Sequence, residues 1–339
     1  MGKKICIIQK KKYIFAAFFE DSMMKKTAIL CFSLFIVTCL QAERVVPVSY
    51  GSFETWTVRH IKESKLIGGK MRTLYVVAPT DTIEGNVPYV YGKKGNPWSM
   101  SDAYAVVAGI HKAAGTVFPE KRGDGTCCRM DVKMMEVVVM GFINIHVLVN
   151  GTIFWGKTIE PIRTANDPYQ NIDFGVPFTQ TPKYLQFDYK CRVSPDQWIW
   201  RATGTSPMKK IKGHDECEAY LLLQKRWEDA DGNIHSLRVG TAYERYGEDQ
   251  LTWVNDHRIE VLYGDITNHP SYKPYMGLER PCRAMNSKGK IVPIREEGWA
   301  PQGTKPTHAI LMLTSGCYDA FLGHDGNAFW IDNVKLVYE

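Results

Sequence analysis

From residue 50 to the C-terminus, the sequence consists of short runs of β-forming residues separated by Gly, Pro, Asn and Asp. Residues 218–227 and 234–243 are two such runs, and the Asp-Ala-Asp-Gly-Asn sequence between them is typical of a hairpin turn. Many strands at this short spacing are typical of a β-sandwich or a β-barrel. We therefore predict an all-β fold with long loops and few short helices.

A second hairpin is predicted at Asn150 and Gly151, because both residue types tolerate positive φ angles. This hairpin would join an alternating run at 143–149 to a second run at 152–155. Further strands are predicted at 184–193, 309–313 and 328–338.

No linker rich in Pro or Ser divides residues 43–339, and the sequence has no repeat period. A single domain over 43–339 is the simplest arrangement, and a separate N-terminal subdomain ending near Val87 is the alternative. The main helical signal, at 101–114, amounts to one or two turns. It is weakened by Gly109 and by the β-branched pair at 106–107.

The N-terminal region has the order of features found in a secretory signal peptide. Lys25 and Lys26 precede an apolar run at 28–40, and Ala42 supplies a small residue for cleavage. The run is shorter than a membrane-spanning helix. We therefore predict that residues 1–42 are an upstream extension plus a signal peptide, and that the protein is exported to the periplasm or cell surface.

Residues 1–22 lie upstream of the point where such an export signal normally begins. The predicted translation start is therefore Met23 or Met24. Cys39 is a candidate for lipid attachment, but Thr38 stands where Gly, Ala or Ser is usual. A lipid anchor at Cys39 is thus the less favoured alternative, and no transmembrane segment is expected in the mature chain.

The excess of basic residues is confined to the predicted leader. The whole sequence has a formal charge of +6, whereas residues 43–339 contain 35 basic and 34 acidic residues. A nearly neutral chain does not favour nucleic acid or an anionic membrane as a partner. Six of the nine cysteines lie in this region without a CxxC pair. They are predicted to be buried apolar side chains rather than zinc ligands or a disulfide scaffold.

The sequence lacks the motifs of phosphate-binding loops, serine hydrolases, zinc proteases and dinucleotide-binding proteins. Glu216 and Glu218 would share one face of a strand, as the paired carboxylates of a glycoside hydrolase must, but solvated strands carry such pairs routinely. No catalytic residue is therefore assigned.

Tryptophan placement points instead to carbohydrate binding. Trp98, Trp155 and Trp299 stand next to turn residues, where an exposed ring can stack on the apolar face of a sugar. Burial in the core is the more common role for any single tryptophan. The remaining candidate contacts, which would bind sugar hydroxyls, are Asp102, Tyr318 and Asp319.

Two C-terminal segments, 314–323 (TSGCYDAFLG) and 327–339 (NAFWIDNVKLVYE), resemble the closing region of the PCMD family. This family consists of exported Bacteroidetes proteins and is named for carbohydrate metabolism. Shorter matches are found at 96–99 (NPWS), 174–179 (FGVPFT), 223–240 and 263–265.

The resemblance implies a jelly-roll β-sandwich that recognises or helps to use a polysaccharide or oligosaccharide. A glycoside hydrolase or lyase on the same fold and a surface protein-interaction module are the alternatives. In similar jelly-roll modules, a first-strand Glu and a last-strand Asp help to hold a structural calcium ion. Glu54 and Asp332 occupy the analogous positions, and calcium is the only cofactor that the resemblance suggests.

Overall fold

The computed structural model describes residues 43–339 except 94, 140–142, 165–166, 205 and 279. Residues Val45–Tyr338 form one compact unit. The predicted leader lies outside the described residues, together with Met23, Met24 and Cys39. The predictions of export, translation start and lipid attachment therefore stay predictions.

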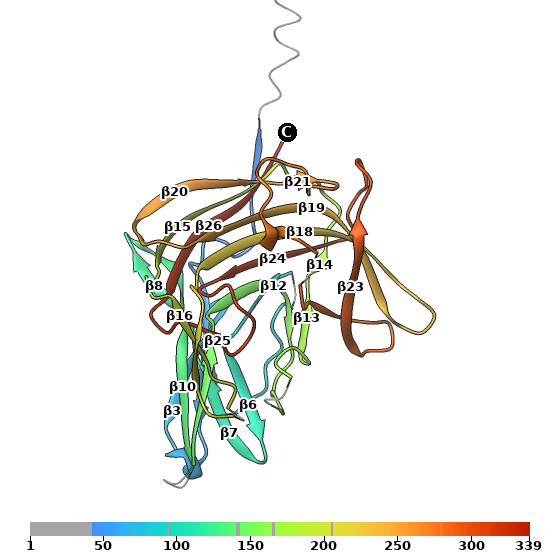
Figure 1. The fold of residues 1–339 in the computed structure, drawn as a ribbon. Coiled ribbons are helices and arrows are strands. Elements are labelled where there is room, and N and C mark those ends of the chain that lie inside the picture. Colours follow the sequence, from blue (N-terminus) through green and yellow to red (C-terminus); the bar gives the residue numbers. More distant parts are fainter. Residues whose placement is uncertain (1–42, 94, 140–142, 165–166, 205, 279) are drawn as a thin grey trace, which may run out of the picture. The chain divides into compact units, whose positions relative to one another are not determined.

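The described chain is almost entirely β-structure, which confirms the predicted fold class. Its first large element is a six-stranded sheet (Figure 1). Across this sheet lie β20 (Gln250–Glu260), β15 (Tyr184–Arg192), β26 (Ala328–Tyr338), β9 (Gly125–Asp131) and β8 (Val117–Arg122), with β1 (Arg44–Pro47) also paired to β26.

The second large element is a ten-stranded sheet, in which Figure 1 shows β12, β24, β18 and β19 side by side. Across it lie β13 (Ile172–Phe174), β12 (Thr152–Thr158), β24 (His308–Thr314), β18 (Cys217–Glu228), β19 (Ile234–Tyr246), β23 (Ile291–Trp299) and β22 (Arg283–Met285). Three short strands pair with parts of its interior strands: β5 (Trp98–Met100) with β12, β14 (Val176–Pro177) with β24 and β21 (Leu262–Tyr263) with β19. The pairing of β18 with β19 confirms the predicted hairpin at 218–243.

The two large sheets share one apolar core, as in a β-sandwich. Alternate residues of each strand point into this core, because successive side chains of a strand lie on opposite faces. Leu185 and Phe187 of β15 and Leu221 and Leu223 of β18 are fully buried there. Burial of each such side chain contributes about 1.5–3 kcal/mol, so this alternation holds the two sheets together.

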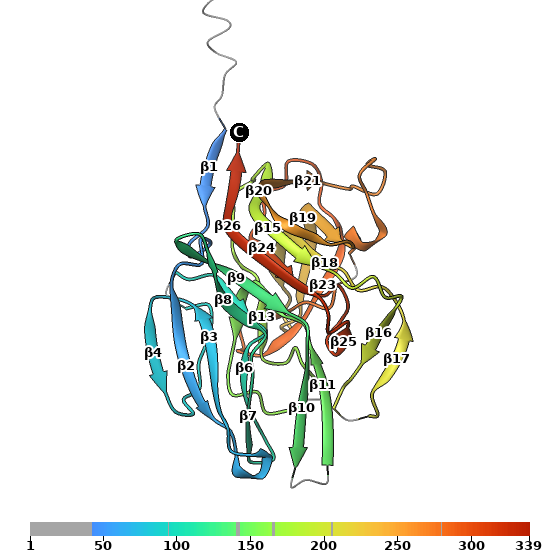
Figure 2. The ribbon, with the colours of Figure 1, turned by 90° about the vertical axis from the view of Figure 1, so that its left-hand side faces the viewer.

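Smaller sheets extend from the sandwich (Figure 2). They comprise the sheet of β2 (Trp56–Lys62), β3 (Met71–Val77) and β4 (Asp81–Glu84), the hairpins β6 (Ala103–Val107) with β7 (Ile110–Ala114) and β10 (Lys133–Val139) with β11 (Ile143–Val149), and the sheet of β17 (Lys209–Lys212), β16 (Trp198–Arg201) and β25 (Leu322–Gly323). The two helices of the described chain are single 3₁₀ turns, η1 (Lys65–Ile67) and η2 (Pro274–Met276). Neither is long enough to cross a membrane.

The hairpin predicted at Asn150 and Gly151 is wrong. β11 pairs with β10, whereas β12 pairs with β5, β13 and β24, so the two residues connect different sheets. A side chain at Gly151 would lie 2.6 Å from the backbone nitrogen of Asp131, which explains the glycine. The Asn150 Nδ2 donates hydrogen bonds to the carbonyl oxygens of Tyr318 (3.3 Å) and Leu322 (3.1 Å). These residues therefore serve close packing and loop attachment.

The helical signal at 101–114 is also overturned, because this segment forms the β6–β7 hairpin. Its turn contains Ala108 and Gly109, whose φ angles are 48° and 77°. Positive φ at both central residues is the conformation that matches the twist of hairpin strands. The β-branched pair at 106–107 and Gly109, which weakened the helix, are thus the residues that favour the hairpin.

All six cysteines of the described region are buried, as predicted, and none of them is bridged to another. Cys127 packs with Trp330 in a satellite cluster, whereas Cys128 lies in the main core. Adjacent residues of β9 therefore face opposite sides of the sheet, as predicted.

Candidate functional site

A cavity of about 300 Å³ lies on the face of the ten-stranded sheet that points away from the sandwich core. Its floor consists of residues that alternate with core residues along three neighbouring strands. These floor residues are Thr152 and Phe154 of β12, Met312 and Thr314 of β24, and Glu218 and Tyr220 of β18.

Strand register arranges the floor in two rows. Thr152, Thr314 and Glu218 are directly paired across the strands and form a polar row, in which the two threonine hydroxyls lie 2.8 Å apart. Phe154, Met312 and Tyr220 form the neighbouring apolar row in the same way. The antiparallel pairing thus brings residues from distant parts of the sequence onto one surface.

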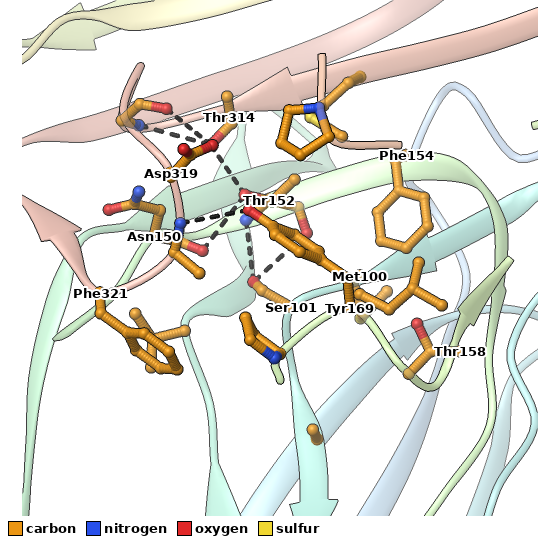
Figure 3. A pocket seen from close by; sticks show the side chains of 18 of the residues that line it. Met100, Ser101, Asn150, Thr152, Phe154, Thr158, Tyr169, Thr314, Asp319 and Phe321 are labelled. Carbon is orange, nitrogen blue, oxygen red and sulfur yellow. Dashed lines mark hydrogen bonds between the residues drawn. The ribbon is translucent and has the colours of Figure 1, made fainter. Parts of the chain in front are cut away.

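Aromatic side chains surround this floor (Figure 3). Tyr169 comes from the segment between β12 and β13, Phe174 from β13, and Phe321 from the loop between β24 and β25. A concave, mostly apolar lining with a few polar groups is typical of a small-molecule site.

Asp319 and Tyr169 are among the lining residues of the described chain that can still hydrogen-bond to a ligand. The Asp319 side chain lines the cavity, is exposed, and has no hydrogen-bond partner in the described part of the chain. The Tyr169 hydroxyl accepts a hydrogen bond from the backbone nitrogen of Ala320 (3.2 Å), which leaves its own proton free. Burial raises the pKa of Tyr169 to about 12, so this hydroxyl stays a donor at neutral pH.

Glu218 is fixed in the floor by several donors. The Tyr243 hydroxyl donates to its Oε2 at 2.6 Å, Arg245 Nε donates to the same atom at 3.1 Å, and Arg280 Nη1 donates to Oε1 at 3.2 Å. Burial raises the pKa of Glu218 to about 7, against the opposing effect of the two guanidinium groups. The carboxyl group is therefore held in position, and its pKa is raised by burial.

The loop that carries Asp319 and Phe321 is anchored at both ends by a buried carboxylate. Asp215 accepts hydrogen bonds from the backbone nitrogens of Cys317 (2.9 Å) and His324 (2.8 Å). Together with the two bonds from Asn150, these contacts fix the cavity wall from outside the loop. Phe321 has a φ of 71°, a strained angle for a bulky residue that the surrounding contacts must maintain.

Of the residues predicted from sequence, Tyr318 and Asp319 line the cavity. Trp98 and Trp155 do not, because they lie in the core on the other side of the sheet with 0 and 4% of their surface exposed. Their rings contact each other, and Trp98 Nε1 donates to the carbonyl oxygen of Ser49. The prediction that these two rings form an exposed platform is therefore wrong: both fill the core.

Asp102 and Trp299 also lie outside the cavity lining. Asp102 is completely buried, and its Oδ1 accepts hydrogen bonds from the backbone nitrogens of Thr116 (2.6 Å) and Val117 (2.9 Å). This carboxyl group joins two segments of the fold and is closed to a ligand, which corrects its predicted role. Trp299 is half-buried against the second apolar cluster, and its role in binding stays a prediction.

Sequence reasoning missed Tyr169, because it lies in a segment without a strand pattern. The sequence indicated Glu218 only because it shares a strand face with Glu216. Both carboxylates lie near Arg245, Glu218 at 3.1 Å and Glu216 at 3.7 Å. Asp215 carried no signal, because its contacts depend on a loop a hundred residues away in the sequence.

The two residues proposed for calcium contact protein groups. Asp332 pairs with the Arg122 guanidinium at 2.6 Å, and Glu54 accepts a hydrogen bond from the backbone nitrogen of Thr126 at 3.0 Å. Within the described ranges, no three His, Cys, Asp or Glu side chains gather so that they could share a metal ion. The calcium site stays a prediction.

Ser194, His324 and Asp196 lie close together but do not form a nucleophilic triad. The Ser194 hydroxyl and the Asp196 carboxylate both approach the same ring nitrogen, His324 Nε2, at 3.3 and 3.1 Å. The other nitrogen, Nδ1, accepts a hydrogen bond from the backbone of Gly326. A triad needs the serine and the carboxylate on opposite ring nitrogens, so this cluster lacks its geometry.

No family model and no curated protein matches the chain. A solved structure from Bacteroides thetaiotaomicron, provisionally described as a glycoside hydrolase, is 18% identical, with 83% of this chain and 71% of that chain covered and a TM-score of 0.43. Another from Bacteroides vulgatus, described in the same way, is 13% identical, with 88% of this chain and 96% of that chain covered and a TM-score of 0.36. Both scores are too low to support an argument about this chain, and the resemblance to the PCMD family stays a prediction.

Proposed function

We propose that the protein binds a carbohydrate in the cavity on the ten-stranded sheet. The observation that supports this proposal is that aromatic rings line one concave site together with the Asp319 carboxylate and a Tyr169 hydroxyl whose proton is free to be donated. A sugar ring has apolar C–H faces and a rim of hydroxyl groups, and it therefore requires both kinds of contact. The modest volume, about 300 Å³, suits a short oligosaccharide or the end of a longer chain.

In this proposal each side chain has a distinct role. Tyr169 and Phe321 provide ring surfaces, and the Tyr169 hydroxyl donates a hydrogen bond to a sugar oxygen. Asp319 accepts hydrogen bonds from sugar hydroxyls. Bonds to a charged acceptor are the stronger kind, each contributing about 1.5–3 kcal/mol, so Asp319 should contribute most to orientation.

A glycan-array screen followed by titration calorimetry on the bound glycans tests the proposal. Asp319→Ala and Tyr169→Ala should each weaken binding about tenfold or more, since the loss of about 1.4 kcal/mol has that effect. Asp325→Ala removes an exposed carboxylate outside the cavity and is the matched control. Binding to no glycan, or equal losses in Asp319→Ala and the control, would contradict the proposal.

Hydrolysis of a glycan in the same cavity is the second candidate, and one observation favours it. Glu218 and Asp319 line the same site, and a pKa of about 7 for Glu218 is suited to a general acid. If the protein is a hydrolase, Glu218→Gln should abolish release of reducing sugar while binding persists. A glycan that binds to the wild-type protein without any release of reducing sugar would leave binding alone as the function.

A further inference from the structure

The hairpin of β16 and β17 carries a cluster of cations that the cavity does not use. Lys209, Lys210 and Lys212 are all exposed on β17, and Arg201 is exposed on β16. In the described part of the chain, none of these four side chains is within ion-pair distance of a carboxylate. Other cations of the sandwich, such as Arg122 and Arg129, do have such a partner.

Two tryptophans share a face of this hairpin with Lys210 and Lys212, whereas Lys209 and Arg201 are paired on the opposite face. Register pairs Trp198 with Lys212 and Trp200 with Lys210, so the four side chains lie on the same side. The Lys210 Nζ lies 3.5 Å from the centroid of the Trp198 ring and 5.1 Å from that of Trp200. Both rings are partly exposed, and neither indole N–H has a partner among the described residues.

Lysines on an edge strand such as β17 also discourage unwanted strand pairing. That role accounts for the charges, but it requires no aromatic rings and no free indole donors on the same face. The combination of cations, ring surfaces and N–H donors instead matches a ligand that has negative charges, apolar ring faces and hydrogen-bond acceptors.

From this combination we infer that the β16–β17 hairpin is a second binding site, which takes a polyanionic glycan such as a uronate-containing or sulfated polysaccharide. Lys210 and Lys212 contact the anionic groups, and Trp198 and Trp200 on the same face contact the sugar rings. Lys209 and Arg201, on the opposite face, add positive charge to the hairpin. This site is distinct from the cavity, since none of the hairpin's residues lines it. A negative result here therefore leaves the cavity proposal standing.

The test measures binding of the purified protein to polygalacturonate, dextran sulfate, neutral dextran, polyglutamate and duplex DNA. We expect one or both anionic glycans to bind, neutral dextran not to bind, and binding to weaken as NaCl screens the charges. The two anionic glycans distinguish a carboxylate from a sulfate ligand. Equal affinity for polyglutamate or DNA would overturn the assignment to a glycan, as would binding to neither anionic polysaccharide.

Variants then locate the site. The triple replacement of Lys209, Lys210 and Lys212 by Gln should weaken binding about three- to 150-fold, because each surface ion pair contributes about 0.2–1 kcal/mol. The same replacement of the exposed Lys62, Lys65 and Lys70 removes equal charge elsewhere and should have little effect.

Trp198→Ala should weaken glycan binding while leaving weak polyglutamate binding unchanged. Equal losses in the two triple variants, or no loss with Trp198→Ala, would overturn the inference, and circular dichroism confirms that each variant is folded.

Discussion

The carboxyl group of Asp102 illustrates how a single residue can be misread from sequence. Its position beside Trp98 and several serines indicated a binding loop, yet both residues are completely buried. One oxygen of Asp102 accepts hydrogen bonds from the backbone, and the other, Oδ2, has no partner. Burial raises the pKa of Asp102 from 3.8 to about 7.

This pKa shift predicts that Asp102 makes stability depend on pH. Between about pH 4 and pH 7 the folded state holds a proton that the unfolded state has lost, so stability decreases as pH rises through this window. Asp102→Asn removes this titration. We expect the stability of the variant relative to the wild type to increase by up to about 4 kcal/mol from pH 4 to pH 7.5.

Urea denaturation at several pH values measures this difference. The amide that Asp102→Asn introduces does not titrate, so any cost of burying it is the same at every pH. The pH dependence of the difference in unfolding free energy therefore reports only the titration of Asp102 in the wild type. Asp325→Asn, at an exposed position, is the matched control. A constant difference between Asp102→Asn and the wild type across the window would contradict the prediction.

Among the elements, the loop from β24 to β25 depends most on contacts with other parts of the chain. Asn150 donates to two of its carbonyl oxygens, and Asp215 accepts from two of its backbone nitrogens. Since this loop carries Asp319 and Phe321, its attachment determines the shape of the cavity wall.

We expect Asn150→Ala to weaken ligand binding more than it destabilises the fold. The two hydrogen bonds that Asn150 makes to the loop together contribute roughly 1–3 kcal/mol, and their loss would destabilise the bound conformation of the loop. Hydrogen exchange should show faster exchange at 317–323 than in the wild type, with β18 unaffected. Thr158 also lines the cavity, and its hydroxyl is hydrogen-bonded to that of Ser99, so Thr158→Ala serves as a control for the loss of a lining polar group. Unchanged exchange in the loop would refute the prediction.

The elements also show where sequence patterns suffice. The β18–β19 hairpin was predicted because alternation and turn residues lie within one continuous segment. The turn predicted at Asn150 and Gly151 was wrong because contacts distant in sequence explain both residues. Gly151 packs closely against the backbone of Asp131, and Asn150 donates a hydrogen bond to the carbonyl oxygen of Tyr318. Sequence patterns therefore predict the pairing of strands that are adjacent in the sequence. They mislead where a residue is required by a contact with a distant part of the chain.

At the scale of the whole molecule, the all-β class and the buried cysteines could be predicted, but the cavity could not. Its floor combines residues from β12, β18 and β24, which meet only through the order of strands in the sheet. Tyr318 and Asp319 were found through a resemblance in one segment, whereas Tyr169 and Glu218 required the assembled sheet.

The shared core predicts that the two large sheets unfold together. Leu221→Ala, at a fully buried position between them, should lower the free energy of unfolding by about 2–5 kcal/mol. Ile211→Ala, on the exposed edge strand β17, should change it by less than about 1 kcal/mol. Denaturation followed by tryptophan fluorescence and by circular dichroism should give coincident transitions for Leu221→Ala, and separate transitions would show that the sheets unfold independently.

The alternation along β18 restricts how this protein can vary in length. Inserting one residue before Glu218 would turn Glu218 and Tyr220 toward the core and Ala219 and Leu221 toward the cavity. Insertion of two residues would restore the original faces. Substitutions can therefore change the chemistry of the cavity floor one residue at a time, whereas a regular strand beneath the cavity keeps its faces only when its length changes by two residues.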